Sequence, residues 1–366
     1  MRFLLDAEQT AFVRTLDQLL AAADPPAAVR AWSAGDHGPG RALWERLAGT
    51  GVFALAVPEE YDGLGPLPVE IAAAFVELGR HAVPGPLAET VAVCALLRGL
   101  GDRGPAKEWL PRIASGEVLV TLAPAPAGSY ALDADAADAV FHVVADGLAV
   151  AVAAGHGPVR ASLDPARRLA RPTGGEPLVT GPAVRDAVRQ AADWASFATA
   201  AQSLGTGLAL MERTVAYVKQ RTQFGTAIGG FQAVKHQLAN ALLGLEFARP
   251  LLYGAAVALA GGSPGAGRDI AAAKVACGEA AYAAARTALQ LHGAIGYTAE
   301  YDLSLWIGKA TALRTAWGTP SECRARVLET ADPAAQPERH RRRGDGIAGV
   351  GVRNAAELFV GRQARK

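Results

Sequence analysis

Long alanine-rich segments with helical spacing dominate the second half of the sequence and most constrain its fold. Glycine-rich breaks separate these segments, which span residues 187–221, 231–261, 266–294 and 301–316. Helices this long and this rich in alanine pack closely against one another. The sequence therefore predicts a helical bundle over residues 185–330.

The first third of the chain is also expected to be helical. Residues 1–115 show helical spacing of apolar side chains, interrupted by loop signals. The expected helices span 6–23, 41–51, 68–80 and 86–100. Asp24-Pro25-Pro26 is expected to end the first of them. These residues predict an all-helical N-terminal domain.

The pattern changes between the two helical regions. Residues 116–184 contain short β-like runs separated by turn clusters, at 118–122, 139–144 and 148–153. Short strands without long helices favour a small barrel or sandwich of antiparallel strands. The predicted class is mainly α with a small β domain. The last stretch, 331–366, is basic and is expected to be an extended or disordered tail.

Composition excludes several classes of protein. The net charge of +1 gives no general electrostatic reason to bind nucleic acid. Cys94, Cys277 and Cys323 form no CxxC pair, which argues against a zinc site or a disulfide framework and fits a reducing compartment. Apolar runs such as 251–260 are too short to span a bilayer. With no apolar signal region at the start, the sequence predicts a cytoplasmic protein without a membrane span.

Two stretches carry the chemistry, QRTQFGTAIGGFQ at 220–232 and QLHGAIGYTAEYD at 290–302. Arg221 lies at the expected end of one helix, and Gln232 opens the next. A guanidinium can form a bidentate pair with a pyrophosphate, and glycines such as Gly225 allow its close approach to the backbone. Gly293 and Gly296 can end the later helix while exposed amides face a phosphate. Together the stretches indicate a site for a large phosphate-bearing aromatic cofactor.

These motifs resemble those of the acyl-CoA dehydrogenase family over roughly residues 1–330. The resemblance implies an N-terminal helical domain, a middle β-barrel and a C-terminal four-helix bundle, with FAD as the cofactor. It implies that Arg221, Phe224 and Gln232 bind FAD across a subunit interface. It further implies pyrophosphate contacts from Gln290, Gly293 and Ala294, and a contact of Thr319 with the flavin end.

The sequence departs from the family where catalysis needs an acid. In that family a glutamate removes the α-proton of an acyl-CoA while flavin N5 takes a hydride from the β-carbon, and the glutamate usually precedes a Gly-Thr. Trp317 stands at that position here, and Ala195 stands at the alternative position about 26 residues before Arg221. Asp193 and Glu300 are weak candidates for a displaced base.

The middle region departs as well. The family's Thr-Glu-Pro and Ala-Gly-Ser-Asp pattern corresponds to residues 122–130, LAPAPAGSY, which keep only the Ala-Gly-Ser. The flavin end of the site is thus altered, whereas the phosphate end matches the family.

Both the matches and the departures fit one hypothesis. Some short actinobacterial members, including enzymes of steroid side-chain degradation, work as α2β2 assemblies of unlike subunits. The resemblance predicts that this chain is the subunit without the usual glutamate, acting with a second acyl-CoA dehydrogenase-like subunit on a bulky or steroid-derived acyl-CoA. Electron-transfer flavoprotein is the expected acceptor. The alternatives are a homo-oligomeric enzyme with a displaced base and a non-catalytic relative of the fold.

Overall fold

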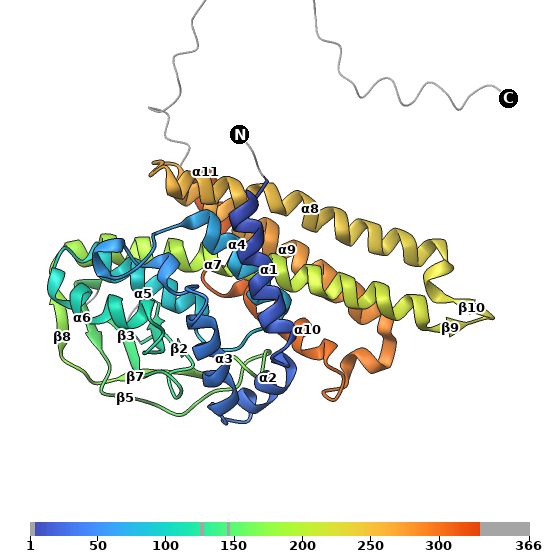
Figure 1. Cartoon of the computed structure of the whole chain (residues 1–366), viewed down its shortest axis with the longest axis horizontal. Helices are drawn as coiled ribbons and strands as arrows, with labels where there is room; N and C mark the ends of the chain where they lie inside the picture. The colour runs from blue at the N-terminus through green and yellow to red at the C-terminus, as the bar shows by residue number, and fades with distance from the viewer. Residues whose placement is uncertain (1–3, 125–127, 145–146, 330–366) are drawn as a thin grey trace, which may run out of the picture. The chain divides into compact units, whose positions relative to one another are not determined.

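The computed structural model describes residues 4–124, 128–144 and 147–329, and residues 1–330 form one compact unit (Figure 1). Its first third is helical, as predicted. The helices are α1 (Ala7–Ala21), α2 (Pro25–Ser33), α3 (Gly38–Ala48), α4 (Pro68–Arg80), α5 (Leu87–Gly99) and α6 (Arg103–Ala114). The predicted tail at 331–366 lies outside the described residues.

The expected end of the first helix is confirmed, but the helix that follows it was not predicted. Asp24-Pro25-Pro26 ends α1 but also starts α2, with Pro25 as its first residue. Proline is well tolerated there because its missing N–H would have no partner in the first turn. Asp24 adopts a left-handed conformation with φ 47°, which turns the chain sharply between α1 and α2.

The middle region is a small mixed sheet. Its strands are β1 (Val120–Ala123), β2 (Ala131–Leu132), β3 (Ala139–Val144), β4 (Ala149–Val152), β5 (Gly155–His156), β6 (Leu169–Ala170), β7 (Pro172–Thr173) and β8 (Pro177–Thr180). The main sheet has the order β1-β3-β4-β8, and two-stranded pairs β2-β6 and β5-β7 accompany it. The expectation of antiparallel strands throughout is wrong at one place, because β1 and β3 run parallel, with Val120 opposite Ala139.

The C-terminal part is the predicted bundle. Its long helices are α7 (Ala183–Gln220), α8 (Gln232–Ala260), α9 (Ala266–His292) and α10 (Leu303–Thr315), followed by α11 (Pro320–Glu329). α7 packs against α9 on one side and against α4 and α5 on the other. Glycine allows this close approach, because a Cβ on Gly205 would lie 1.8 Å from the carbonyl oxygen of Val76 in α4. α7 therefore joins the bundle to the N-terminal helices.

α8 differs from its neighbours because much of its apolar surface is exposed. It has 29 residues, and by length and composition alone it is apolar enough to cross a membrane. The run 251–260, which was expected to be too short to span a bilayer, is the last third of this longer helix. Only 28% of its most apolar window is buried. Its exposed large side chains are Leu242, Leu243, Phe247, Leu251 and Val257.

Candidate functional site

The first predicted stretch forms a projecting tip where α7 ends. A short hairpin of β9 (Thr222–Gln223) and β10 (Thr226–Ala227) lies at the far end of α7 in Figure 1. Its two loop residues, Phe224 and Gly225, have φ angles of 54° and 77°. Positive φ at both central residues is what a type I′ turn requires, and asparagine and glycine fill these positions best. Phe224 is therefore an unfavourable residue for its backbone, and its ring is 93% exposed.

The polar groups beside this turn are available for a ligand. Arg221 follows the last residue of α7 and is exposed, as is Gln232 at the start of α8. Across the part of the chain described here, the Arg221 guanidinium forms no hydrogen bond or ion pair. A Cβ built on Gly225 would meet nothing within 4 Å, so the backbone there is open to an approaching group. An unpaired guanidinium beside open backbone suits a pyrophosphate.

The second predicted stretch lies next to the first. Gly293 ends α9 with φ 65°, and a short 3-10 helix (Gly293–Tyr297) follows. The ring of His292 stacks on Tyr217, one turn before Arg221, with ring centroids 4.0 Å apart. This stack joins the ends of α9 and α7. His292 is itself a packed residue, since its Nδ1 pairs with the Ala288 carbonyl and burial lowers its pKa.

A cavity of about 250 Å³ marks the end of α9. Its lining includes the predicted ligands Gln290 and Gly293, together with Leu289 and Tyr297. Arg286 also lines it and was not among the predicted site residues. It lies four residues before Gln290, on the same helix face, so helical spacing alone gives the signal for it. Ala294 is exposed in the same 3-10 helix. The donor set of Arg221, Arg286, Gln232 and Gln290 fits the phosphates of a dinucleotide.

The usual base position has no acid and holds the partly buried Trp317. Trp317 has φ 55°, and its indole Nε1 donates a 2.8 Å hydrogen bond to Oε1 of Glu89 in α5. Glu89 is only 3% exposed. The Arg167 guanidinium, between β5 and β6, lies 3.7 Å from the same carboxylate. Sequence reasoning did not connect Trp317 with Glu89, because 228 residues separate them.

The alternative base position is closed. Ala195 and Ser196 are fully buried in α7, and the Ser196 Oγ has no hydrogen-bond partner among the described residues. Asp193 is held in an ion pair by Arg326 of α11, with the oxygen and nitrogen 2.6 Å apart. Glu300 is exposed and lines a separate cavity of about 340 Å³ between α7 and the segment before α10. The structure brings neither acid next to Trp317.

Thr319 is engaged within this chain. Its backbone N–H and its hydroxyl both donate to Oε2 of Glu322, at 2.8 and 2.7 Å, which caps the start of α11. Of the altered middle segment at 122–130, residues 125–127 lie outside the described residues. The predicted flavin end, where Thr319 is bonded within the chain, thus differs from the predicted phosphate end, where Arg221 and Gln232 are exposed.

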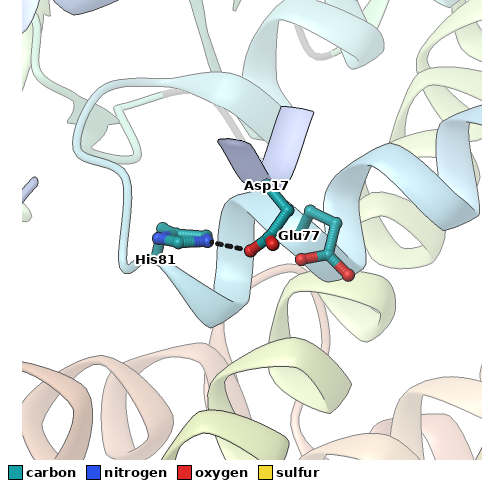
Figure 2. Close-up of side chains that lie close together, drawn as sticks. All are labelled: Asp17, Glu77 and His81. Atoms are coloured by element: carbon teal, nitrogen blue, oxygen red, sulfur yellow. Dashed lines mark hydrogen bonds and ion pairs between the residues drawn. The ribbon is translucent and has the colours of Figure 1, made fainter. Parts of the chain in front are cut away.

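A second polar cluster lies away from this site. Figure 2 shows Asp17, Glu77 and His81, whose ligand atoms lie close enough together to hold a metal ion. Asp17 Oδ1 accepts a 2.8 Å hydrogen bond from Nε2 of His81, and Glu77 Oε2 lies 3.3 Å from Arg80 Nε. Burial raises the pKa of Glu77 to about 7. Since Arg80 already supplies a cation, we interpret the cluster as an ion-pair network between α1 and α4.

Comparisons with known proteins agree with the geometry. Family models described as the N-terminal and C-terminal domains of acyl-CoA dehydrogenase match residues 6–117 and 184–330. Acyl-CoA dehydrogenase IpdE2 of Mycobacterium tuberculosis is 35% identical over 86% of this chain and 94% of that protein. FadE34 of the same organism is 34% identical over 74% of this chain and 39% of that protein.

Solved structures share the fold. The ChsE4-ChsE5 complex from Mycobacterium tuberculosis matches with a TM-score of 0.80 and 22% identity, over 92% of this chain and 100% of that one. The FAD complex of PigA matches with a TM-score of 0.77 and 19% identity, over 90% of this chain and 98% of that one. At these identities the matches establish the architecture.

Proposed function

Because the chain belongs to the acyl-CoA dehydrogenase family, we propose that it is the subunit without the usual glutamate base in an α2β2 enzyme. The enzyme would desaturate a bulky or steroid-derived acyl-CoA between its α- and β-carbons. Membership of the family makes the chain part of an oxidoreductase, and FAD is its cofactor. When bound, FAD supplies a hydride acceptor.

One observation carries the proposal. The predicted phosphate-binding groups around Arg221 and Phe224 are exposed at a projecting tip. The two base positions hold Ala195, which is buried, and Trp317, whose indole donates to Glu89, and neither side chain can accept a proton. A chain that presents cofactor ligands outward and lacks its own base is suited to complete a site on another chain. In this proposal Arg221 and Gln290 bind and orient the pyrophosphate, and the partner provides the carboxylate.

The names of related proteins support the substrate class and the partner. One structural neighbour is described as a steroid acyl-CoA dehydrogenase, Tcur3481-Tcur3483, with a TM-score of 0.77 and 23% identity. The ChsE4-ChsE5 neighbour is a complex of two chains. We propose electron-transfer flavoprotein as the electron acceptor and the cytoplasm as the location.

Co-purification tests the proposal. The chain is expressed alone and with a candidate acyl-CoA dehydrogenase-like partner subunit, and bound flavin is measured by absorbance. We expect stoichiometric flavin and turnover of acyl-CoA only in the complex. Stoichiometric flavin together with full activity in the lone chain would refute the two-subunit proposal. A colourless complex would favour a non-catalytic relative of the fold.

A further inference from the structure

Helix α8 runs along one edge of the bundle (Figure 1) and exposes two apolar surfaces that point in different directions. One faces α7 and lines a groove of about 610 Å³ through residues that include Leu238 and Leu242. The other is a ridge of Leu243, Phe247 and Leu251, which are 53%, 73% and 46% exposed. Successive helical residues are turned by about 100°, so this ridge points away from the groove.

The α8 ridge cannot be covered by its own bundle. The buried residues of α8, which include Leu245 and Leu252, lie on the other side of the helix, where it packs against α9 and α4. Pro250 and Val257 are exposed as well and extend the apolar surface of the ridge. Contiguous exposed apolar side chains of this kind mark a surface for another molecule.

The order of residues in the ridge is symmetric about its centre. Leu243 and Leu251 lie four residues to either side of Phe247, so the three side chains form one row on the helix. When two such helices run antiparallel about a two-fold axis at Phe247, the two rings meet and each Leu243 lies beside Leu251 of the other copy. A contact of this kind is isologous, because both copies use the same residues.

Charge does not oppose a contact between two copies. A second copy brings the same charges, so an excess of one sign beside the ridge would repel it. Residues 239–257 contain one glutamate, one arginine and no other charged residue. These two residues, Glu246 and Arg249, form an ion pair at 3.2 Å. The ridge is therefore apolar, neutral and matched to itself.

The proposed function, on which this inference rests, assigns the unlike subunit to the tip at the ends of α7 and α9 and leaves the ridge uncovered. A stable interface buries about 800 Å² on each partner. A single aromatic side chain supplies about 150–250 Å² of such an area. We propose that the α8 ridge packs against the α8 ridge of a second copy of this chain. The two copies then meet at the centre of the α2β2 assembly, and each holds an unlike subunit at its tip.

Light scattering on the purified complex tests the contact. Phe247→Asp brings two carboxylates together at the two-fold axis. We expect the wild-type complex to contain two copies of each chain and the variant to contain one of each, with the same amount of flavin per pair. The control is Leu163→Asp, which changes a leucine 75% exposed between β5 and β6 and should keep the wild-type mass.

Cysteine cross-linking gives a second measurement that adds no charge. The native cysteines are buried, so Phe247→Cys adds an accessible thiol. A disulfide joins residues whose Cα atoms lie within about 7 Å. Oxidised glutathione should therefore convert Phe247→Cys into a covalent dimer of this chain. Leu243→Cys should cross-link with Leu251→Cys in a mixed sample more readily than with itself, whereas Leu163→Cys should stay monomeric on a denaturing gel.

Other occupants of the ridge give different results, and each refutes the contact between like chains. A Phe247→Asp complex that loses the unlike subunit and its flavin assigns the ridge to that subunit, as do cross-links from Phe247→Cys to the unlike chain. Binding of the wild-type complex to phosphatidylglycerol vesicles, lost in Phe247→Asp, assigns the ridge to a membrane.

Separate outcomes overturn the like-chain contact and the proposed function. A flavin-containing wild-type complex with one copy of each chain refutes the contact and leaves the proposed function standing. If no flavin-containing complex forms with an acyl-CoA dehydrogenase-like subunit, the proposed function fails. Cross-linking of the lone Phe247→Cys chain then still decides whether two copies meet at α8, and the absence of a covalent dimer refutes the contact.

Discussion

Replacing Phe224 with asparagine should stabilise the lone chain while weakening cofactor binding. Phe224 has φ 54° at the first loop position of the β9-β10 hairpin and is 93% exposed, so little buried apolar contact is lost on substitution. Asparagine is several-fold enriched over other residues in the left-handed region, which corresponds to about 1 kcal/mol. For a unit of this size that gain raises the Tm by roughly 2 °C.

The same substitution should lower the affinity of the complex for flavin. The ring at the tip is expected to contact FAD bound by the partner, and an aromatic contact of this kind contributes about 0.5–1.5 kcal/mol. Flavin affinity of the complex should therefore fall by up to about tenfold. Differential scanning fluorimetry of the lone chain gives the Tm, and flavin titration of the apo-complex gives the affinity.

A control separates backbone strain from simple loss of an exposed ring. Phe247 in α8 is 73% exposed but has ordinary helical backbone, and phenylalanine and asparagine have similar helix propensities. Phe247→Asn should therefore not raise the Tm of the lone chain. If Phe224→Asn lowers the Tm, the argument from backbone strain is wrong. If it leaves flavin affinity unchanged, the prediction that the β9-β10 hairpin contacts FAD is wrong.

Three further predictions follow from single residues. Arg221→Ala should abolish flavin retention by the complex, measured by absorbance after gel filtration. The control Arg14→Ala, which removes an exposed arginine from α1, should leave flavin retention unchanged. Burial raises the pKa of Glu77 to about 7 from 4.5, so its contribution to stability is complete below pH 4.5 and is lost as pH rises through 7. Glu77→Gln should thus raise the free energy of unfolding by about 1–3 kcal/mol at pH 8 and have little effect near pH 4.5; equal effects at both pH values contradict this. Gly205→Ala should destabilise by about 3 kcal/mol or more, because its Cβ would clash with the Val76 carbonyl, whereas Gly254→Ala in open helical space should stabilise slightly in thermal melts of the lone chain.

The helices were predictable because their signals are local. Alanine-rich runs broken by glycine predicted α7 to α10 within a few residues of their observed ends, and 68–80 coincides with α4. The parallel pairing of β1 with β3 was not predictable in this way, because strand order depends on contacts between segments distant in sequence. Helix α2 was missed for a different reason: Pro25, which was correctly expected to follow the end of one helix, also begins another.

Some parts of the candidate site could likewise be predicted from local sequence, and others could not. The exposed residues at the ends of α7 and α9 belong to two short stretches of sequence. Their candidate role in binding a cofactor could therefore be predicted from the sequence. The contact of Trp317 with Glu89 joins residues 228 positions apart and needs the fold to be seen. Sequence alone therefore indicated that neither expected base position carries an acid, and the structure added the contact that Trp317 makes there.

Three features that are consistent with a partner lie on the α7 and α8 pair. Arg221 is unpaired within the described residues, Phe224 is strained and exposed, and α8 leaves most of its apolar window uncovered. An apolar groove of about 610 Å³ between the two helices, lined by residues that include Met211 and Leu242, continues this surface. The strained turn and the exposed apolar surface do not help a solitary chain to fold, whereas the exposed guanidinium is hydrated and free to bind an anion. A partner that covers the groove and brings a phosphate-bearing ligand to the tip would bury the apolar surface and pair the guanidinium, which supports our proposal that the cofactor site of this chain lies at an interface.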